Sequence, residues 1–170
     1  MGRESIRSGR VRIGLLASAL TCLCVVAMRP ALAAPPTTAK MTAKAPKDLV
    51  AGQAFTLTVD IQIVPPYHIQ ANPPKEGYIG TVLVLGPTKG LQAGKIVYPQ
   101  GTSIVFAGET LPVYKDELTL KVPVTAAKPG KYVMPLSLRF QACNETQCYP
   151  PEIAGATVTL NVAGAVKGHH

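Results

Sequence analysis

Apolar and polar side chains alternate along most of the chain after residue 54. The pattern is clearest over 55–63, where every second residue is a large apolar one: Phe55, Leu57, Val59, Ile61 and Ile63. Successive side chains of a β-strand point to opposite faces, so this period of two predicts a strand with one buried face. Similar segments predict further strands at about 79–85, 95–98, 103–106, 116–124, 131–142 and 156–162.

Turn-forming residues separate these segments, and no stretch keeps the 3.6-residue apolar period of an amphipathic helix. The turn signals are Gly86-Pro87, Gly90, Gly94, Gly108 and Pro129-Gly130. The chain has 170 residues with 16 Pro and 15 Gly, which is the length of one ordinary domain with many turns. We therefore predict an all-β fold, with one antiparallel β-sandwich domain over 48–163.

The first 33 residues have a different pattern. Residues 1–12 carry four arginines, residues 13–28 are uncharged and largely apolar, and Ala31-Leu32-Ala33 has the small-x-small form of a signal-peptidase site. This order is typical of a secretory signal, so we predict a cleaved signal peptide over 1–33 and an exported, periplasmic protein. The alternative is an uncleaved N-terminal anchor, although a membrane span needs about 20 apolar residues.

Two further segments flank the predicted domain. Residues 34–47 are mainly Pro, Thr, Ala and Lys without an apolar period, which predicts a flexible linker, and 164–170 are expected to be a disordered tail. The whole chain has a net charge of +8, but most of the excess lies before Asp48. From Asp48 onward the sequence has 9 basic and 8 acidic residues, and this near-neutral balance excludes a basic nucleic-acid surface.

The four cysteines divide in the same way. Cys22 and Cys24 lie in the predicted signal, which leaves Cys143 and Cys148 for the exported domain, where an oxidising compartment allows them to pair. A disulfide between Cys143 and Cys148 would close a loop of only six residues. Such a cross-link stabilises a fold by only about 2 kcal/mol, against about 4.7 kcal/mol for a loop of 100 residues. Spacing alone leaves both a structural disulfide and a redox pair open.

The strand predicted at 131–142 places the first cysteine. Its apolar residues fall on one face and its polar residues, Arg139 among them, on the other. If the strand runs to its end without a break, Cys143 continues the polar face and leaves the core at the rim of a sheet.

The segment 138–152 (LRFQACNETQCYPPE) resembles the N-terminal domain of DsbD, the thiol:disulfide interchange protein. That family carries the same order of glutamine, small residue, cysteine, polar loop, cysteine and Pro-Pro-Glu. The segments 113–120 and Tyr67-His68-Ile69 also match family positions, so the resemblance spans roughly 50–162.

The resemblance implies an immunoglobulin-like sandwich with the cysteine pair at one end, acting as a thiol:disulfide oxidoreductase of the protein-disulfide reductase type. Electrons would pass from a membrane-embedded partner through Cys143 and Cys148 to thioredoxin-fold periplasmic proteins, without a cofactor or a metal. Cys148 would form the mixed disulfide with the target, and Cys143 would be the resolving thiol.

The family also covers its cysteines with an aromatic cap, a position that Phe106 matches. Tyr67, Arg139 and Tyr149 are possible neighbours of the site. Some relatives carry acidic residues just before the cap phenylalanine, where this chain has Ile104 and Val105, so an acid-assisted step is not expected. The electron donor is expected to be a separate membrane electron transporter, because the sequence stops before any membrane domain.

Other function classes are weaker. A non-catalytic, immunoglobulin-like protein-binding module with a structural loop disulfide is the main alternative, since fold does not decide function. A metal site made of both cysteines and His68 is less favoured, because two cysteines without a CxxC spacing rarely bind zinc. The chain has neither a G-x-S-x-G nor an H-E-x-x-H motif, which disfavours a hydrolase.

Overall fold

The structure is a computed structural model that describes residues 37–165, and this part of the chain consists of strands and connecting loops. The predicted signal peptide (1–33) and residues 166–170 of the predicted tail lie outside the described residues. Within the described range, no helix is long and apolar enough to cross a membrane.

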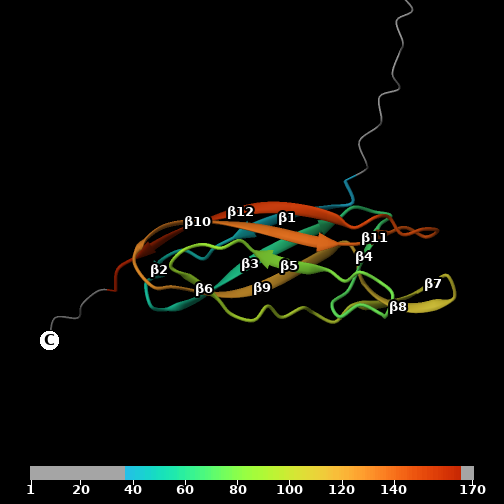
Figure 1. Cartoon of the computed structure of the whole chain (residues 1–170), viewed down its shortest axis with the longest axis horizontal. Coiled ribbons are helices and arrows are strands. Elements are labelled where there is room, and N and C mark those ends of the chain that lie inside the picture. The colour runs from blue at the N-terminus through green and yellow to red at the C-terminus, as the bar shows by residue number, and fades with distance from the viewer. Residues whose placement is uncertain (1–36, 166–170) are drawn as a thin grey trace, which may run out of the picture. The chain divides into compact units, whose positions relative to one another are not determined.

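Twelve strands of the described residues form three four-stranded sheets (Figure 1). The first sheet contains, in spatial order, β1 (Ala39–Lys44), β3 (Ala54–Ile63), β9 (Glu117–Ala126) and β6 (Leu91–Ala93). The second contains β2 (Leu49–Val50), β12 (Glu152–Ala163), β10 (Gly130–Phe140) and β5 (Val82–Leu85). The third contains β11 (Ala142–Cys143), β4 (His68–Gln70), β8 (Glu109–Tyr114) and β7 (Thr102–Phe106).

The first two sheets enclose the core of the sandwich, and the third lies at one end of it (Figure 1). The strict alternation along β9 and β10 sends every second side chain inward. Both sheets contribute fully buried side chains, among them Leu57, Ile61, Ile63, Leu120, Leu138, Phe140 and Leu160. Every pairing is antiparallel except that of β2 with β12. The prediction of an all-β, immunoglobulin-like antiparallel sandwich is confirmed.

The prediction of a flexible linker over 34–47 is wrong for residues 39–44. This segment is strand β1, which pairs along its whole length with β3, from Ala39 opposite Ile63 to Lys44 opposite Thr58. Ala39 and Met41 are buried, whereas Lys40, Thr42 and Lys44 are exposed. The segment therefore has the period of two, but its inward residues are mostly small, so the apolar signal is weak.

The short strands were the hardest to predict. The expected strand at 95–98 is wrong, because only an isolated bridge between Val97 and Lys121 occurs there and the strand β6 lies earlier. The short strand β4 was not predicted either, although it lies next to both β8 and β11. Through its pairing with β11, β4 lies beside Cys143.

Candidate functional site

Cys143 and Cys148 are joined by a disulfide across a tight hairpin at the end of β11. Their Cα atoms are 3.9 Å apart. The backbone N–H of Tyr149 donates to the carbonyl of Ala142 at 2.8 Å, and that of Asn144 donates to the carbonyl of Gln147 at 2.9 Å. The hairpin is thus closed by backbone hydrogen bonds as well as by the disulfide.

The side chain of Asn144 shapes the turn between the cysteines. Its Oδ1 accepts hydrogen bonds from the backbone N–H groups of Thr146 and Gln147, both at 2.9 Å, as expected of asparagine in a turn. Its Nδ2 donates to the hydroxyl of Tyr149 at 3.0 Å. Asn144 therefore holds both the turn and the aromatic residue that follows the second cysteine.

Gln141 interrupts the strand just before the cysteine pair, so Cys143 does not lie where the sequence pattern predicts it. β10 ends at Phe140, and β11 resumes at Ala142 in a different sheet, where it pairs with β4. The expectation that Cys143 lies on the polar face with Arg139 is therefore wrong, and Cys143 is fully buried. Arg139 is exposed on β10, between its register partners Val82 and Ile153.

The two cysteines differ in exposure. Cys143 has no exposed surface, whereas Cys148 is only partly buried. A molecule approaching from solvent therefore reaches Cys148 first. The disulfide therefore joins one partly exposed cysteine to one enclosed cysteine.

The strand β4 lies beside Cys143 and contributes two buried polar side chains. His68 is the register partner of Cys143, and the Nε2 of Gln70 lies 3.4 Å from the Sγ of Cys143. His68 is 4% exposed and Gln70 is 0% exposed. Burial lowers the pKa of His68 below its ordinary value, and the positive charge of Lys115 lowers it further.

Aromatic residues lie near the pair, next to His68 and to Cys148. The ring of Phe106 meets the ring of His68 edge to face, with 6.2 Å between centroids. Phe106 is half-buried near the tip of the β7–β8 hairpin, whose turn at Ala107 and Gly108 has φ angles of 49° and 80°. The rings of Tyr67 and Tyr149 meet edge to face at 5.6 Å, and Tyr149 directly follows Cys148.

The structure thus brings most of the expected site residues together. Tyr149 lies on the cysteine hairpin, Tyr67 contacts Tyr149, and Phe106 contacts the histidine opposite Cys143. Arg139 was expected near the pair because it shares the polar face of the predicted strand with Cys143. That reason fails, since β10 ends before Cys143. Sequence reasoning missed Gln70 and gave His68 no role in the redox pair, although two polar residues that alternate with Ile69 in an apolar context were a usable signal.

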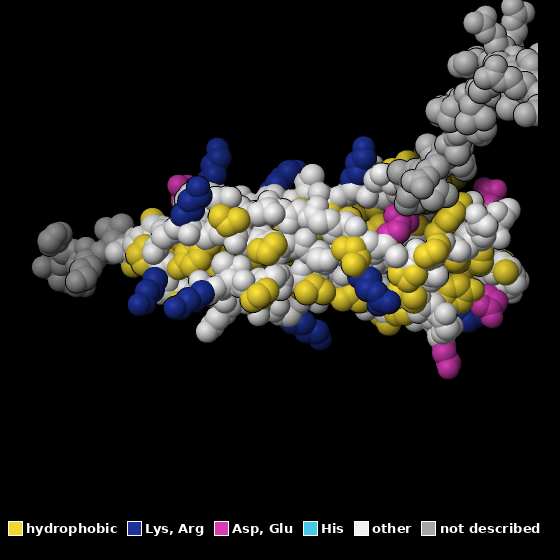
Figure 2. Space-filling view, turned by 45° about the horizontal axis from the view of Figure 1, so that its top comes forward, with side chains coloured by type: hydrophobic (Ala, Val, Ile, Leu, Met, Phe, Trp, Pro, Cys, Tyr) yellow, Lys and Arg dark blue, Asp and Glu magenta, His cyan; other side chains and the backbone are white. Residues whose placement is uncertain are grey.

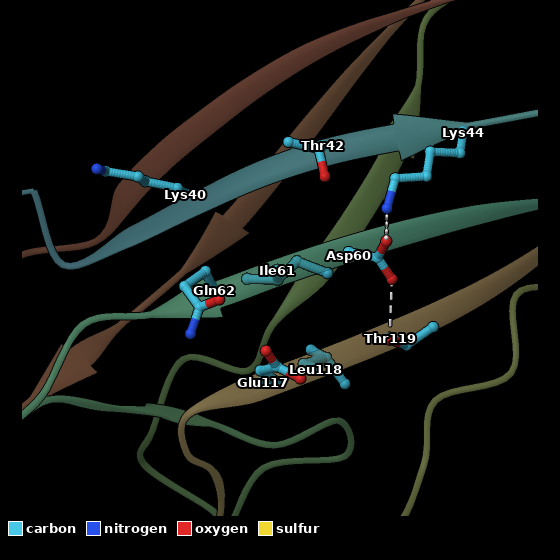
Figure 3. Close-up of a pocket in the computed structure, with 9 residues that line it drawn as sticks. All are labelled: Lys40, Thr42, Lys44, Asp60, Ile61, Gln62, Glu117, Leu118 and Thr119. Carbon is cyan, nitrogen blue, oxygen red and sulfur yellow. Dashed lines mark hydrogen bonds and ion pairs between the residues drawn. The ribbon is translucent and has the colours of Figure 1, made fainter.

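A second concave region lies away from the pair, on the outer face of β1, β3 and β9 (Figure 3). Lys44 Nζ lies 3.0 Å from Asp60 Oδ2, and Thr119 donates to Asp60 Oδ1 at 3.0 Å. These contacts lower the pKa of Asp60, with the hydrogen bond from Lys44 as the largest cause. In the part of the chain that the structure describes, no three His, Cys, Asp or Glu side chains group together to hold a metal ion.

Comparison with known proteins identifies the family. A family model described as "Thiol:disulfide interchange protein DsbD, N-terminal" matches residues 34–159. No curated protein matches the chain.

Three solved structures are similar to this chain. The chain is 22% identical to the reduced N-terminal domain of DsbD from Neisseria meningitidis, with a TM-score of 0.43 over 62% of this chain and 77% of that one. It is 14% identical to the N-terminal periplasmic domain of ScsB from Proteus mirabilis, with a TM-score of 0.52 over 74% of this chain and 47% of that one. It is 13% identical to a cohesin module of a family 33 glycoside hydrolase from Clostridium perfringens, with a TM-score of 0.51 over 76% of this chain and all of that one. The last two share the fold, whereas the family match covers both the sandwich and the disulfide hairpin, and the chain belongs to the family of the N-terminal domain of the thiol:disulfide interchange protein DsbD.

Proposed function

We propose that this chain is an exported thiol–disulfide exchange module, a protein-disulfide reductase that passes electrons through Cys143 and Cys148 to periplasmic partner proteins. The observation that carries the proposal is the unequal burial of the two bonded cysteines in a hairpin of a DsbD-family domain. An exchange pair needs one sulfur that a partner can reach and a second that is protected until the first has reacted.

The hairpin is suited to opening and closing the disulfide. Its turn is held by the hydrogen bonds of Asn144 and by the bond from Tyr149 to Ala142, and these do not depend on the sulfur atoms. The Nε2 of Gln141 also donates to the carbonyl of Tyr149 at 3.2 Å, while its Oε1 accepts from the N–H of Ile79 at 3.3 Å. Because a loop this short gains only about 2 kcal/mol from cross-linking, reduction leaves most of the stability in place.

The electron transfer takes place in two exchanges. In the dithiol form, the thiolate of Cys148 attacks a disulfide of the partner, and one partner sulfur leaves as a thiolate that takes up a proton. Cys143 then attacks Cys148, restores the Cys143–Cys148 bond and releases the second partner sulfur. Two electrons and two protons have moved to the partner. In this proposal the partner has a thioredoxin fold, and a separate membrane electron transporter returns the pair to the dithiol.

Aromatic residues would control access to the pair. Phe106 would act as a cap, and its ring contact with the histidine opposite Cys143 supports this role. The neighbouring Val105 is 76% exposed and Ile153 is 73% exposed. Figure 2 shows apolar side chains gathered toward the end of the domain that carries the third sheet. An apolar surface of this kind favours docking of a protein partner over reaction with small polar oxidants.

The proposal is tested by trapping the mixed disulfide. Cys143→Ser leaves an attacking thiol with nothing to release it, so this variant should accumulate a covalent complex with an oxidised thioredoxin-fold protein on non-reducing gels. Cys148→Ser serves as the matched control and should trap none, because Cys143 is buried. The reverse result would exchange the two roles.

The same experiment separates the redox reading from its main alternative. If neither variant traps a partner, and the wild-type disulfide survives millimolar dithiol in the folded protein, the pair is structural. The chain would then be a protein-binding module of the same fold.

A further inference from the structure

Two buried polar atoms beside the cysteine pair lack hydrogen-bond partners among the described residues. They are the Nε2 of His68 and the Oε1 of Gln70. Both residues belong to β4 and stand two positions apart, so their side chains leave the same face of that strand. Leaving a buried polar atom unpaired costs about 1–3 kcal/mol, so two such atoms at one place need an explanation.

That face of β4 is the face that meets Cys143. His68 is opposite Cys143 in the antiparallel register, and the amide of Gln70 already reaches its Sγ from the diagonal position at 3.4 Å. The disulfide offers these two acceptors no proton donor. Reduction creates a thiol S–H at Cys143, on the side of β11 that faces these two residues.

The resolving step sets a specific demand at this position. Only a thiolate attacks a disulfide efficiently, and a thiol enclosed by apolar groups ionises less readily than one in water. Cys143 is fully buried and cannot pass its proton directly to solvent. A resolving thiol in this position therefore needs a group of the protein that takes its proton.

We propose that His68 and Gln70 activate Cys143 for the resolving step, His68 by accepting the thiol proton at Nε2 and Gln70 by donating its amide N–H to the resulting thiolate. This inference rests on the proposed function and adds two residues to those that take part in the exchange reaction. In the mixed disulfide, the proton moves from Cys143 Sγ to His68, and the thiolate attacks Cys148 Sγ. The bond between Cys148 and the partner breaks, and the partner sulfur leaves with the electron pair. The imidazolium then returns its proton to the leaving thiolate or to water.

The surroundings keep His68 in its neutral form, the form in which a ring nitrogen can accept a proton. Burial and Lys115 lower its pKa, so the imidazole is neutral at neutral pH. Lys115 follows β8, the neighbour of β4, while β11 contributes Cys143 and β7 contributes the uncharged Phe106. Tyr67 precedes His68 in the chain, and its own pKa is raised by loss of hydration and by Tyr149. No carboxylate is among the groups that shift the pKa of His68.

Gln70 is held in place by its backbone. Its N–H donates to the carbonyl of Gln141 at 3.2 Å, and its carbonyl accepts from both the N–H and the hydroxyl of Thr81, at 3.1 and 2.6 Å. The amide is therefore directed at the sulfur by a fixed strand. A hydrogen bond to a charged acceptor is stronger than one to a neutral acceptor, so this contact strengthens when the thiolate forms.

The test uses the reduced protein with one equivalent of 5,5′-dithiobis(2-nitrobenzoate) as a model disulfide. Attack by Cys148 releases the first thionitrobenzoate, and resolution by Cys143 releases the second, so stopped-flow absorbance separates the two steps. His68→Phe keeps the ring and removes its nitrogens. It should slow the second release at pH 7 by about 100-fold, the low end for loss of a general base, and change the first by less than about threefold. Its second-step rate should also rise with pH where the wild-type rate is already level.

Two companion variants sharpen the result. Gln70→Leu should slow the second release by about 10-fold, as expected when a thiolate loses a hydrogen bond of the charge-assisted kind. Ile69→Val, on the opposite face of the same strand, should leave both rates within about twofold of wild type, because it costs only packing. The inference would be overturned if His68→Phe released the second thionitrobenzoate at the wild-type rate and with the wild-type pH profile.

A second measurement covers the case in which His68→Phe does not fold. In a Cys148→Ser background, the ultraviolet absorbance of the Cys143 thiolate against pH reports its ionisation without any reagent having to reach the buried sulfur. His68→Gln in that background should move the midpoint to higher pH, and an unmoved midpoint would refute the role of His68. A wild-type protein that releases only one thionitrobenzoate would instead count against the proposed function itself.

Discussion

Removing Phe106, the proposed cap residue, gives the most direct prediction about access to the pair. In Phe106→Ala the ring that contacts His68 is lost. A fully buried phenylalanine costs about 3–5 kcal/mol when cut to alanine, but Phe106 is only half-buried and makes one edge-to-face contact worth about 0.5–1.5 kcal/mol. We therefore expect a loss of about 1–2 kcal/mol in the free energy of unfolding.

The same energy sets the expected gain in thiol access. If displacing the ring costs the wild type about 1–2 kcal/mol, removing it raises the population of the uncovered state by about 5- to 30-fold. The rate of iodoacetamide alkylation of the reduced protein, followed by mass spectrometry, should rise by the same factor. Urea denaturation of the same samples gives the change in stability.

A matched control separates the cap from a general disturbance of the hairpin. Val105→Ala alters the next residue of β7, whose side chain is 76% exposed and points away from the ring of Phe106. It should change neither the alkylation rate nor the stability. If Phe106→Ala lost 3–5 kcal/mol without faster alkylation, the residue would be an ordinary core phenylalanine and the cap assignment would be wrong.

Three further predictions concern other parts of the chain. The exported protein should begin at Ala34 and contain two cysteines, and an intact mass that still includes Cys22 and Cys24 would show an N-terminal anchor instead. Because burial lowers the pKa of His68, the unfolded chain binds more protons than the folded one at mildly acidic pH, so stability should fall as pH drops below about 6.5; a flat urea midpoint between pH 7.5 and 5 would contradict this. Asn144→Ala should lower the free energy of unfolding by about 1–2 kcal/mol, since it removes two hydrogen bonds to the backbone of the turn. Calorimetry would check this, and a loss found only in the reduced protein would show that the disulfide alone can hold the hairpin.

The local features of this protein were readable from the chain alone. Alternation with a period of two fixes which residues of 55–63 face the core, because neighbouring side chains of a strand must point to opposite sides. The order of residues around Cys143 and Cys148 identified the family, since the hairpin and its turn are built within a few positions. Both kinds of signal depend only on near neighbours.

Features set by distant pairing were decided by the tertiary structure. Residues 39–44 form a strand because β3 offers them hydrogen-bonding partners, and their own apolar signal is too weak to predict it. Cys143 is buried because the chain leaves one sheet at Gln141 and enters another, and a break of one residue reverses the face of every side chain beyond it. His68 and Gln70 meet Cys143 only through the pairing of β4 with β11, across more than 70 residues of sequence. A local pattern records which face a side chain takes in its own strand, but not which strand lies opposite, and here that neighbour determines what surrounds the sulfur.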